Sequence, residues 1–114
     1  MRHYIPTNLK SIFTSDLNKC AVTHIYRGLR RIEVHHVFGA ANRRRSTQYG
    51  YVIPLVAEIH PNGASANDKE CQRLTGLTLK ELDLRLKQEC QYHYEKHHGT
   101  RDDFIKEFGR NYLA

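Results

Sequence analysis

The most regular hydrophobic pattern lies in the C-terminal third of the chain. Apolar residues recur there at intervals of three and four positions, as they do on one face of a helix: Leu79, Leu82, Leu86 and Cys90. Thr78 and Glu81 have the spacing of a capping box, which marks the start of a helix. The pattern therefore predicts a helix that begins at Thr78 and runs to about His97.

A second, shorter helix is predicted directly after the first. Thr100 and Asp103 can cap its start, and Gly109 suits the backbone conformation at a helix end. The apolar residues between these signals are Phe104, Ile105 and Phe108. Residues 78–113 are therefore expected to form two C-terminal helices.

The pattern changes to strict alternation from Ile32 onward. One side of this run carries Ile32, Val34, His36 and Phe38, and the other carries Glu33, His35 and Val37. A second β-rich run, residues 49–55, follows a loop of Gly, Ala, Asn and Arg, so we expect a β-hairpin with a long basic connection. Alternation would place His35 and His36 on opposite faces, unless a bulge or the strand end near Phe38 redirects one of them.

The remaining segments give weaker signals. Residues 1–18 resemble an N-terminal arm with one short element near residues 9–13. Residues 56–60 are expected to start a short helix that ends at Pro61, and the polar stretch from there to Gly76 is expected to be a loop. The order of elements predicts a small α+β fold.

Length and composition agree with a small globular protein. The 114 residues suffice for one domain, residues 1–114, with a single modest core. The chain has 39% hydrophobic residues, and no apolar run approaches the roughly 20 residues that a membrane span requires. Its first residues lack the apolar segment of a secretory signal. We therefore expect a cytoplasmic protein without a membrane partner.

Positive charge points to an anionic partner. The net charge is +6, and the stretch from Arg27 to Arg45 contains six arginines against one acid, Glu33. Such a stretch attracts phosphate without regard to base sequence, which favours nucleic acid. A solvated basic face without a ligand is the alternative.

The adjacent histidines His35 and His36 are the strongest candidates for chemistry. An imidazole with a pKa of about 6.5 can bind a metal ion or act as a general base near neutral pH. Three consecutive arginines follow nearby, Arg43, Arg44 and Arg45, and arginine is well suited to holding phosphate. This combination predicts a nuclease.

The order of these features resembles the ββα-metal active site of the HNH endonuclease family. The resemblance rests on residues 32–38, on residues 52–55, and on His60, five residues after Leu55. It implies a hairpin–helix core at residues 20–68, in which His36 is the general base and His35 and His60 bind one divalent metal ion. The implied substrate is DNA, cut to leave a 3′-hydroxyl and a 5′-phosphate.

Most of the chain from Cys20 onward is also similar to small HNH-like proteins of phages and prophages of Gram-positive bacteria. The segments that carry this likeness are residues 20–23, 41–43, 49–50 and 104–113. The likeness implies a phage or prophage protein that acts in the cytoplasm of a bacterial host cell.

The chain departs from the family at its structural zinc site. Many HNH domains bind that zinc through two Cys-x-x-Cys pairs, and the four matching positions here are Cys20, Thr23, Val56 and Ile59. Only one thiolate is left, so no structural zinc is expected and apolar packing would replace it.

Two further departures concern the catalytic region. Tyr51 stands where the family has the asparagine that gives HNH its middle letter. Asn42 is the residue that could supply a related contact. Ser65 stands where the phage relatives have another histidine. Asn67, or alternatively Asn62, would then complete a site for Mg²⁺ or Mn²⁺ through oxygen, with waters filling the rest. Ni²⁺ and Zn²⁺ are the alternative ions.

The leading hypothesis is a metal-dependent HNH-type endonuclease that hydrolyses DNA. Its catalytic residue would be His36, its metal ligands His35, His60 and Asn67, and its DNA contacts Asn42, Arg43, Arg44 and Arg45. The alternatives are a degenerate HNH-like module that binds nucleic acid without cutting it, and a phage protein that binds a host factor.

Overall fold

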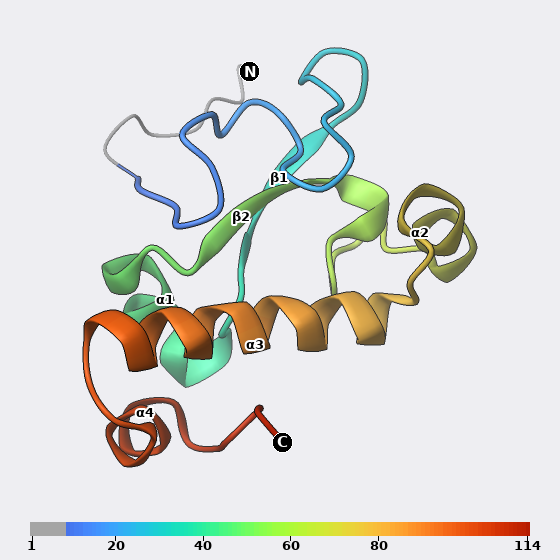
Figure 1. Ribbon diagram of the computed structural model, residues 1–114. Helices are drawn as coiled ribbons and strands as arrows, with labels where there is room; N and C mark the ends of the chain where they lie inside the picture. The colour runs from blue at the N-terminus through green and yellow to red at the C-terminus, as the bar shows by residue number, and fades with distance from the viewer. Residues whose placement is uncertain (1–8) are drawn as a thin grey trace.

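A computed structural model describes residues 9–114 as an α+β fold, in which helices pack around a two-stranded sheet (Figure 1). In chain order its elements are β1 (Ile32–His36), the 3₁₀ turn η1 (Ala40–Asn42), α1 (Arg43–Tyr49), β2 (Val52–Val56), the 3₁₀ turn η2 (Ala57–Ile59), α2 (Asp68–Thr75), α3 (Leu79–His97) and α4 (Arg101–Phe108). The first eight residues of the expected N-terminal arm lie outside this description.

The predicted hairpin is present. β1 and β2 pair antiparallel in five consecutive pairs, from Ile32 opposite Val56 to His36 opposite Val52. Every residue of β2 is buried, whereas β1 is mostly half-buried. The pairing has no bulge, so β1 keeps regular alternation until it ends at His36.

The connection between the strands is a helix and not the expected loop. The prediction missed α1, which carries the three arginines and ends at Gly50 with a φ of 79°. Ser46 anchors this helix because its buried hydroxyl donates to the Phe38 carbonyl and accepts from the Phe38 N–H. A seven-residue polar helix depends on such tertiary contacts, which its sequence does not reveal.

Three further expectations are corrected, two of them in the region after β2. The short helix expected at residues 56–60 is only the turn η2, and His60 follows it in extended backbone. The expected loop before Gly76 contains α2. Residues 9–13 form neither helix nor strand, although the Ile12 N–H donates to the Gly50 carbonyl at 2.9 Å.

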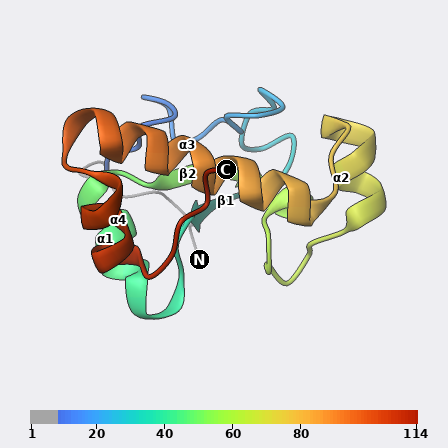
Figure 2. The same ribbon diagram turned by 60° about the horizontal axis from the view of Figure 1, so that its bottom comes forward.

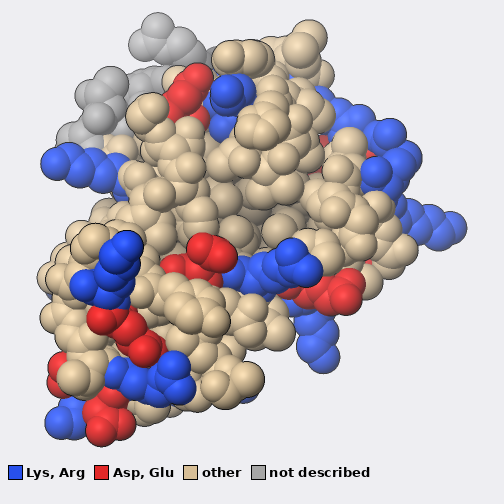
Figure 3. Space-filling view, in the orientation of Figure 1, with Lys and Arg blue, Asp and Glu red and all other residues tan. Residues whose placement is uncertain are grey.

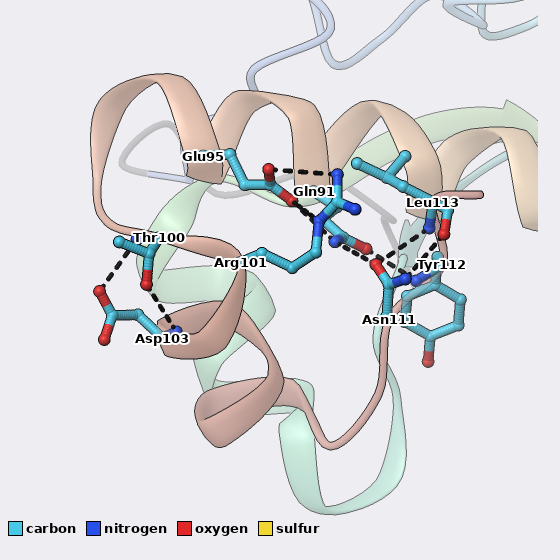
Figure 4. A network of polar contacts seen from close by, with 8 residues as sticks. All are labelled: Gln91, Glu95, Thr100, Arg101, Asp103, Asn111, Tyr112 and Leu113. Atoms are coloured by element: carbon cyan, nitrogen blue, oxygen red, sulfur yellow. Dashed lines mark hydrogen bonds and ion pairs between the residues drawn. The ribbon is translucent and has the colours of Figure 1, made fainter.

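The two C-terminal helices agree with the prediction. α3 and α4 both begin with a complete capping box, at Thr78 and at Thr100. Figure 4 shows how Gln91 of α3 holds the C-terminal tail: its side-chain amide donates to Asn111 Oδ1 at 2.7 Å and accepts from the Tyr112 N–H at 2.8 Å. Arg101 at the start of α4 binds Glu95 of α3. These contacts fix the tail and α4 against α3.

The hydrophobic core lies between the hairpin and α3, which runs beside the strands in both views (Figures 1 and 2). α3 contributes Leu82, Leu86, Cys90 and Tyr94 to it, and α4 contributes Phe104 and Phe108. Cys20, Val56 and Ile59 are fully buried in the same core, while the Thr23 N–H contacts the Cys20 sulfur at 3.3 Å. None of the described helices is both long and apolar enough to cross a membrane.

Candidate active site

The three candidate histidines border one open cavity of about 400 Å³. The cavity lies at the C-terminal end of β1, between the loop after η2 and the N-terminal half of α3. The charged and titratable side chains that line it are His35, His36, Arg43, His60, Asp83 and Lys87. Residues from four separate parts of the chain therefore meet at one place.

His35 and His60 are in direct contact. Their ring centroids are 4.9 Å apart, in an edge-on arrangement. His60 Nδ1 lies 2.6 Å from Glu33 Oε1, and alternation along β1 puts Glu33 on the same side of the strand as His35. A carboxylate bound to one ring nitrogen fixes the tautomer and leaves Nε2 available for a metal ion.

His35 carries a polar atom without a partner. Its side chain is almost entirely buried, and Nε2 has no hydrogen-bond partner among residues 9–114. Asp83 Oδ1 lies 3.6 Å away, which is longer than a hydrogen bond. Burial lowers the pKa of His35 and outweighs the opposing effect of Asp83, so the imidazole is neutral at neutral pH. A neutral, unpartnered imidazole is suited to bind a metal ion.

His36 is the last residue of β1 and is less buried than His35. Its Nε2 lies 3.1 Å from Thr47 Oγ1 on α1. Burial lowers its pKa, and the positive charge of Arg43 lowers it further. Although alternation directs His35 and His36 differently, both border the cavity because the strand ends there.

Sequence reasoning missed two residues of α3, Asp83 and Lys87. Lys87 Nζ lies 2.7 Å from Asp83 Oδ2. Burial would raise the pKa of Asp83, but the neighbouring His35 and Lys87 hold it below its usual value, so the carboxylate remains ionised. The helical period predicts that residues 83 and 87 share a face, but nothing local shows that this face meets the histidines.

The three arginines of α1 share one groove, but only Arg43 also borders the histidine cavity. The same groove is lined by Ala40, Ala41, Thr47 and Gln48. Arg45 Nε lies 3.8 Å from Glu107 of α4. The Asn42 side-chain amide donates to the Phe108 carbonyl and accepts from the Arg45 guanidinium. Both ends of this amide are therefore engaged in contacts within the protein.

The arginines of residues 27–45 do not form one continuous basic surface in the fold. Arg30 lies 3.3 Å from Glu70, and Arg31 lies 3.1 Å from Glu33, so part of the charge is paired with acids. On the face shown in Figure 3, basic and acidic side chains alternate, and a group of basic side chains lies at the right edge, where Figure 1 shows α2. This face is not uniformly basic.

Asn67, Ser65 and Tyr51 lie away from the histidine cavity. The Asn67 side chain caps α2 by accepting from the Glu70 N–H at 3.0 Å. Ser65 is exposed beside Asn67 in a separate hollow. Tyr51 is fully buried, and its hydroxyl lies 3.3 Å from His93 Nδ1. The structure therefore does not bring the predicted ligand Asn67 to His35 and His60, whereas the alternative ligand Asn62 lines their cavity.

The side chains at the cavity meet only some of the requirements of a metal-binding site. Within residues 9–114 no three His, Cys, Asp or Glu side chains are arranged so that together they could hold an ion. The donor chemistry nevertheless suits a divalent ion, because two imidazoles and a carboxylate border one cavity and the buried His35 Nε2 lacks a partner.

Comparison with protein-family models, curated proteins and solved structures found no match to this chain.

Proposed function

We propose that this protein is a metal-dependent endonuclease of the HNH, or ββα-metal, type that hydrolyses DNA phosphodiester bonds. The observation that carries the proposal is the meeting of His35, His36 and His60 at one cavity that also contains Arg43 and Lys87. Imidazoles for metal binding and proton transfer thus lie beside cations that can hold phosphate.

His35 and His60 are the residues that would hold the ion. The buried, unpartnered Nε2 of His35 and the Glu33-bound ring of His60 support this role. A bound divalent ion would supply positive charge to the scissile phosphate and its leaving oxygen.

His36 is the proposed general base. The Thr47 hydroxyl donates to the Arg43 carbonyl at 3.3 Å, so its oxygen accepts from His36 Nε2–H. This leaves the lone pair on Nδ1 to take a proton from water. The lowered pKa of His36 keeps the ring neutral, and therefore basic, at neutral pH.

Arg43 and Lys87 are the proposed phosphate-binding residues at the cavity. Arg43 comes from α1 and Lys87 from α3, so they approach the histidines from different elements. A guanidinium can hold two phosphate oxygens at once, whereas an ammonium acts as a point charge. Arg44 and Arg45 would extend this contact along the α1 groove.

Plasmid nicking tests the proposal. The purified protein is incubated with supercoiled plasmid and Mg²⁺, Mn²⁺ or Ni²⁺, with and without EDTA. We expect nicking that EDTA abolishes and that His36→Ala slows by about 100-fold or more, because a general base contributes at least that much. His97→Ala, which changes an exposed histidine of α3, is the matched control and should nick like the wild type. Undiminished nicking by His36→Ala would exclude His36 as the base.

A second candidate is a module that binds nucleic acid without cutting it. The α1 groove favours it, because three arginines line this groove independently of His35 and His60. This candidate predicts salt-sensitive DNA binding that survives replacement of all three histidines but weakens in Arg44→Ala. Each lost phosphate contact should reduce the slope of log affinity against log salt by about 1.

A further inference from the structure

We propose that Asp83 is the third protein ligand of the metal ion, together with His35 and His60. This inference rests on the proposed function and names a ligand on α3, outside the hairpin region. Asp83 is the carboxylate that borders the cavity, and one of its oxygens points to the unpartnered nitrogen of His35.

The spacing of His35 and Asp83 supports a shared ion. His35 Nε2 and Asp83 Oδ1 are 3.6 Å apart, too far for a hydrogen bond. Two ligands that each lie about 2.0–2.1 Å from a tetrahedral ion are separated by about 3.3 Å. The observed gap is therefore close to the spacing of two ligands around one ion.

The two carboxylate oxygens of Asp83 differ in their contacts, because Lys87 donates to one of them. Oδ2 accepts from Lys87 Nζ at 2.7 Å, whereas the described residues give Oδ1 no hydrogen-bond donor. An ion could bind Oδ1 without breaking the contact with Lys87. The lysine would thus orient the carboxylate, as partners of metal ligands commonly do.

Side-chain movement is needed to bring the three donors together. His35 is held in the core, but the side chains of His60 and Asp83 are each 22% exposed, so neither is locked in place by burial. The movement required is that of side chains at the edge of the cavity. The two-stranded sheet and α3 can stay in place.

Asp83 would supply the ligand that Asn67 does not. Asn67 is engaged in capping α2, whereas Asp83 borders the cavity as a charged carboxylate. An ion held by two imidazoles and a carboxylate has the donor set of many catalytic zinc sites, with a position left open for water or substrate.

Metal titration tests this ligand set without using activity. Co²⁺ is added to metal-free protein, and affinity is measured by calorimetry while visible absorbance reports the coordination. Asp83→Asn keeps the shape of the side chain and should weaken Co²⁺ binding by about 10-fold or more and alter the absorbance. Asp102→Asn, at an exposed position on α4, is the matched control and should bind Co²⁺ like the wild type. Thermal unfolding without metal verifies that each variant is folded.

The outcomes separate this inference from the proposed nuclease function. Equal Co²⁺ affinity and absorbance in Asp83→Asn and the wild type would overturn the ligand assignment, and metal-dependent plasmid nicking would still support the nuclease. A wild type that binds no Co²⁺ would also overturn the assignment. If Asp83→Asn weakens Co²⁺ binding but the wild type does not nick plasmid, the ligand set holds and the nuclease function fails.

Discussion

Glu33 illustrates how one side chain acquires a role from its position on a strand. It lies two residues before His35, so the same face of β1 presents both side chains, and its Oε1 meets His60 at 2.6 Å. Its other oxygen lies 3.1 Å from Arg31. In the sequence this acid only reduces the charge of an arginine-rich run, whereas in the fold it is a positioning residue for a proposed metal ligand.

Glu33→Gln should weaken metal binding while the protein stays folded. A neutral amide holds the His60 ring less firmly than a carboxylate, and loss of such a partner commonly costs about 10-fold or more in metal affinity. Titration with Co²⁺ measures the effect. Glu89→Gln, at an exposed position on α3, is the control. An unchanged affinity in Glu33→Gln would show that its contact with His60 does not support the ion.

Protonation of histidines should make the metal-free protein less stable in acid. Burial lowers the pKa values of His35, His36 and His93 below their usual 6.5. The unfolded chain therefore binds more protons than the folded chain once the pH falls below about 6.5. The free energy of unfolding should be fully retained above that pH and should decline as the pH falls through it.

Denaturant unfolding between pH 7.5 and pH 5, in EDTA, measures this decline. His93→Gln removes one of the three contributions without changing the cavity, so its stability should fall less steeply than that of the wild type. A stability that is constant over this range would contradict the lowered pKa values.

At the scale of elements, two short helices form although their sequences are mostly polar. α1 is fixed by Ser46, and by the hydroxyl of Tyr49, which donates to Glu107 at 2.7 Å. α2 begins at the Asn67 cap and ends at Gly76, whose φ is 78°. Each helix therefore depends on its ends and on tertiary contacts more than on an apolar face.

Asn67→Ala should destabilise the protein without weakening metal binding. Loss of a side-chain cap typically costs about 1 kcal/mol, and Asn67→Ser should recover most of it because serine also caps helices. Denaturant unfolding gives the stability and Co²⁺ titration gives the affinity. A large loss of Co²⁺ affinity in both variants would instead return Asn67 to the ligand set.

At the scale of the whole molecule, α3 connects stability with the candidate site. Its buried face joins the hairpin core, its N-terminal half presents Asp83 and Lys87 to the cavity, and its C-terminal half holds α4 and the tail through Gln91 and Glu95. A shift of this one helix would therefore affect the core and the cavity together.

Gln91→Met should lower the free energy of unfolding by about 2–3 kcal/mol. The side chain is fully buried, and its loss leaves the Tyr112 N–H without its side-chain acceptor and removes one of the two donors to Asn111 Oδ1. Gln72→Met, at an exposed position on α2, should change stability little and serves as the control. Equal stability of the two variants would contradict a structural role for the Gln91 network.

The sequence by itself determined the elements whose signals are local. Each of these signals lies within a few residues of the structure that it specifies. They are the capping boxes at Thr78 and Thr100, the glycine at 109 and the alternation from Ile32. These signals were sufficient for the α+β class, for the hairpin and for both C-terminal helices. They also singled out His35, His36 and His60, which do border one cavity.

Tertiary structure alone decided which other residues join the histidines. Asp83 and Lys87 reach the cavity because α3 packs along the hairpin, a contact between segments almost fifty residues apart in the chain. Tertiary contacts also hold the arginine-rich connection as α1, because the Tyr49 hydroxyl on this helix donates to Glu107 of α4. Local patterns encode periodicity and caps, but contacts across such separations depend on how all the buried faces pack together.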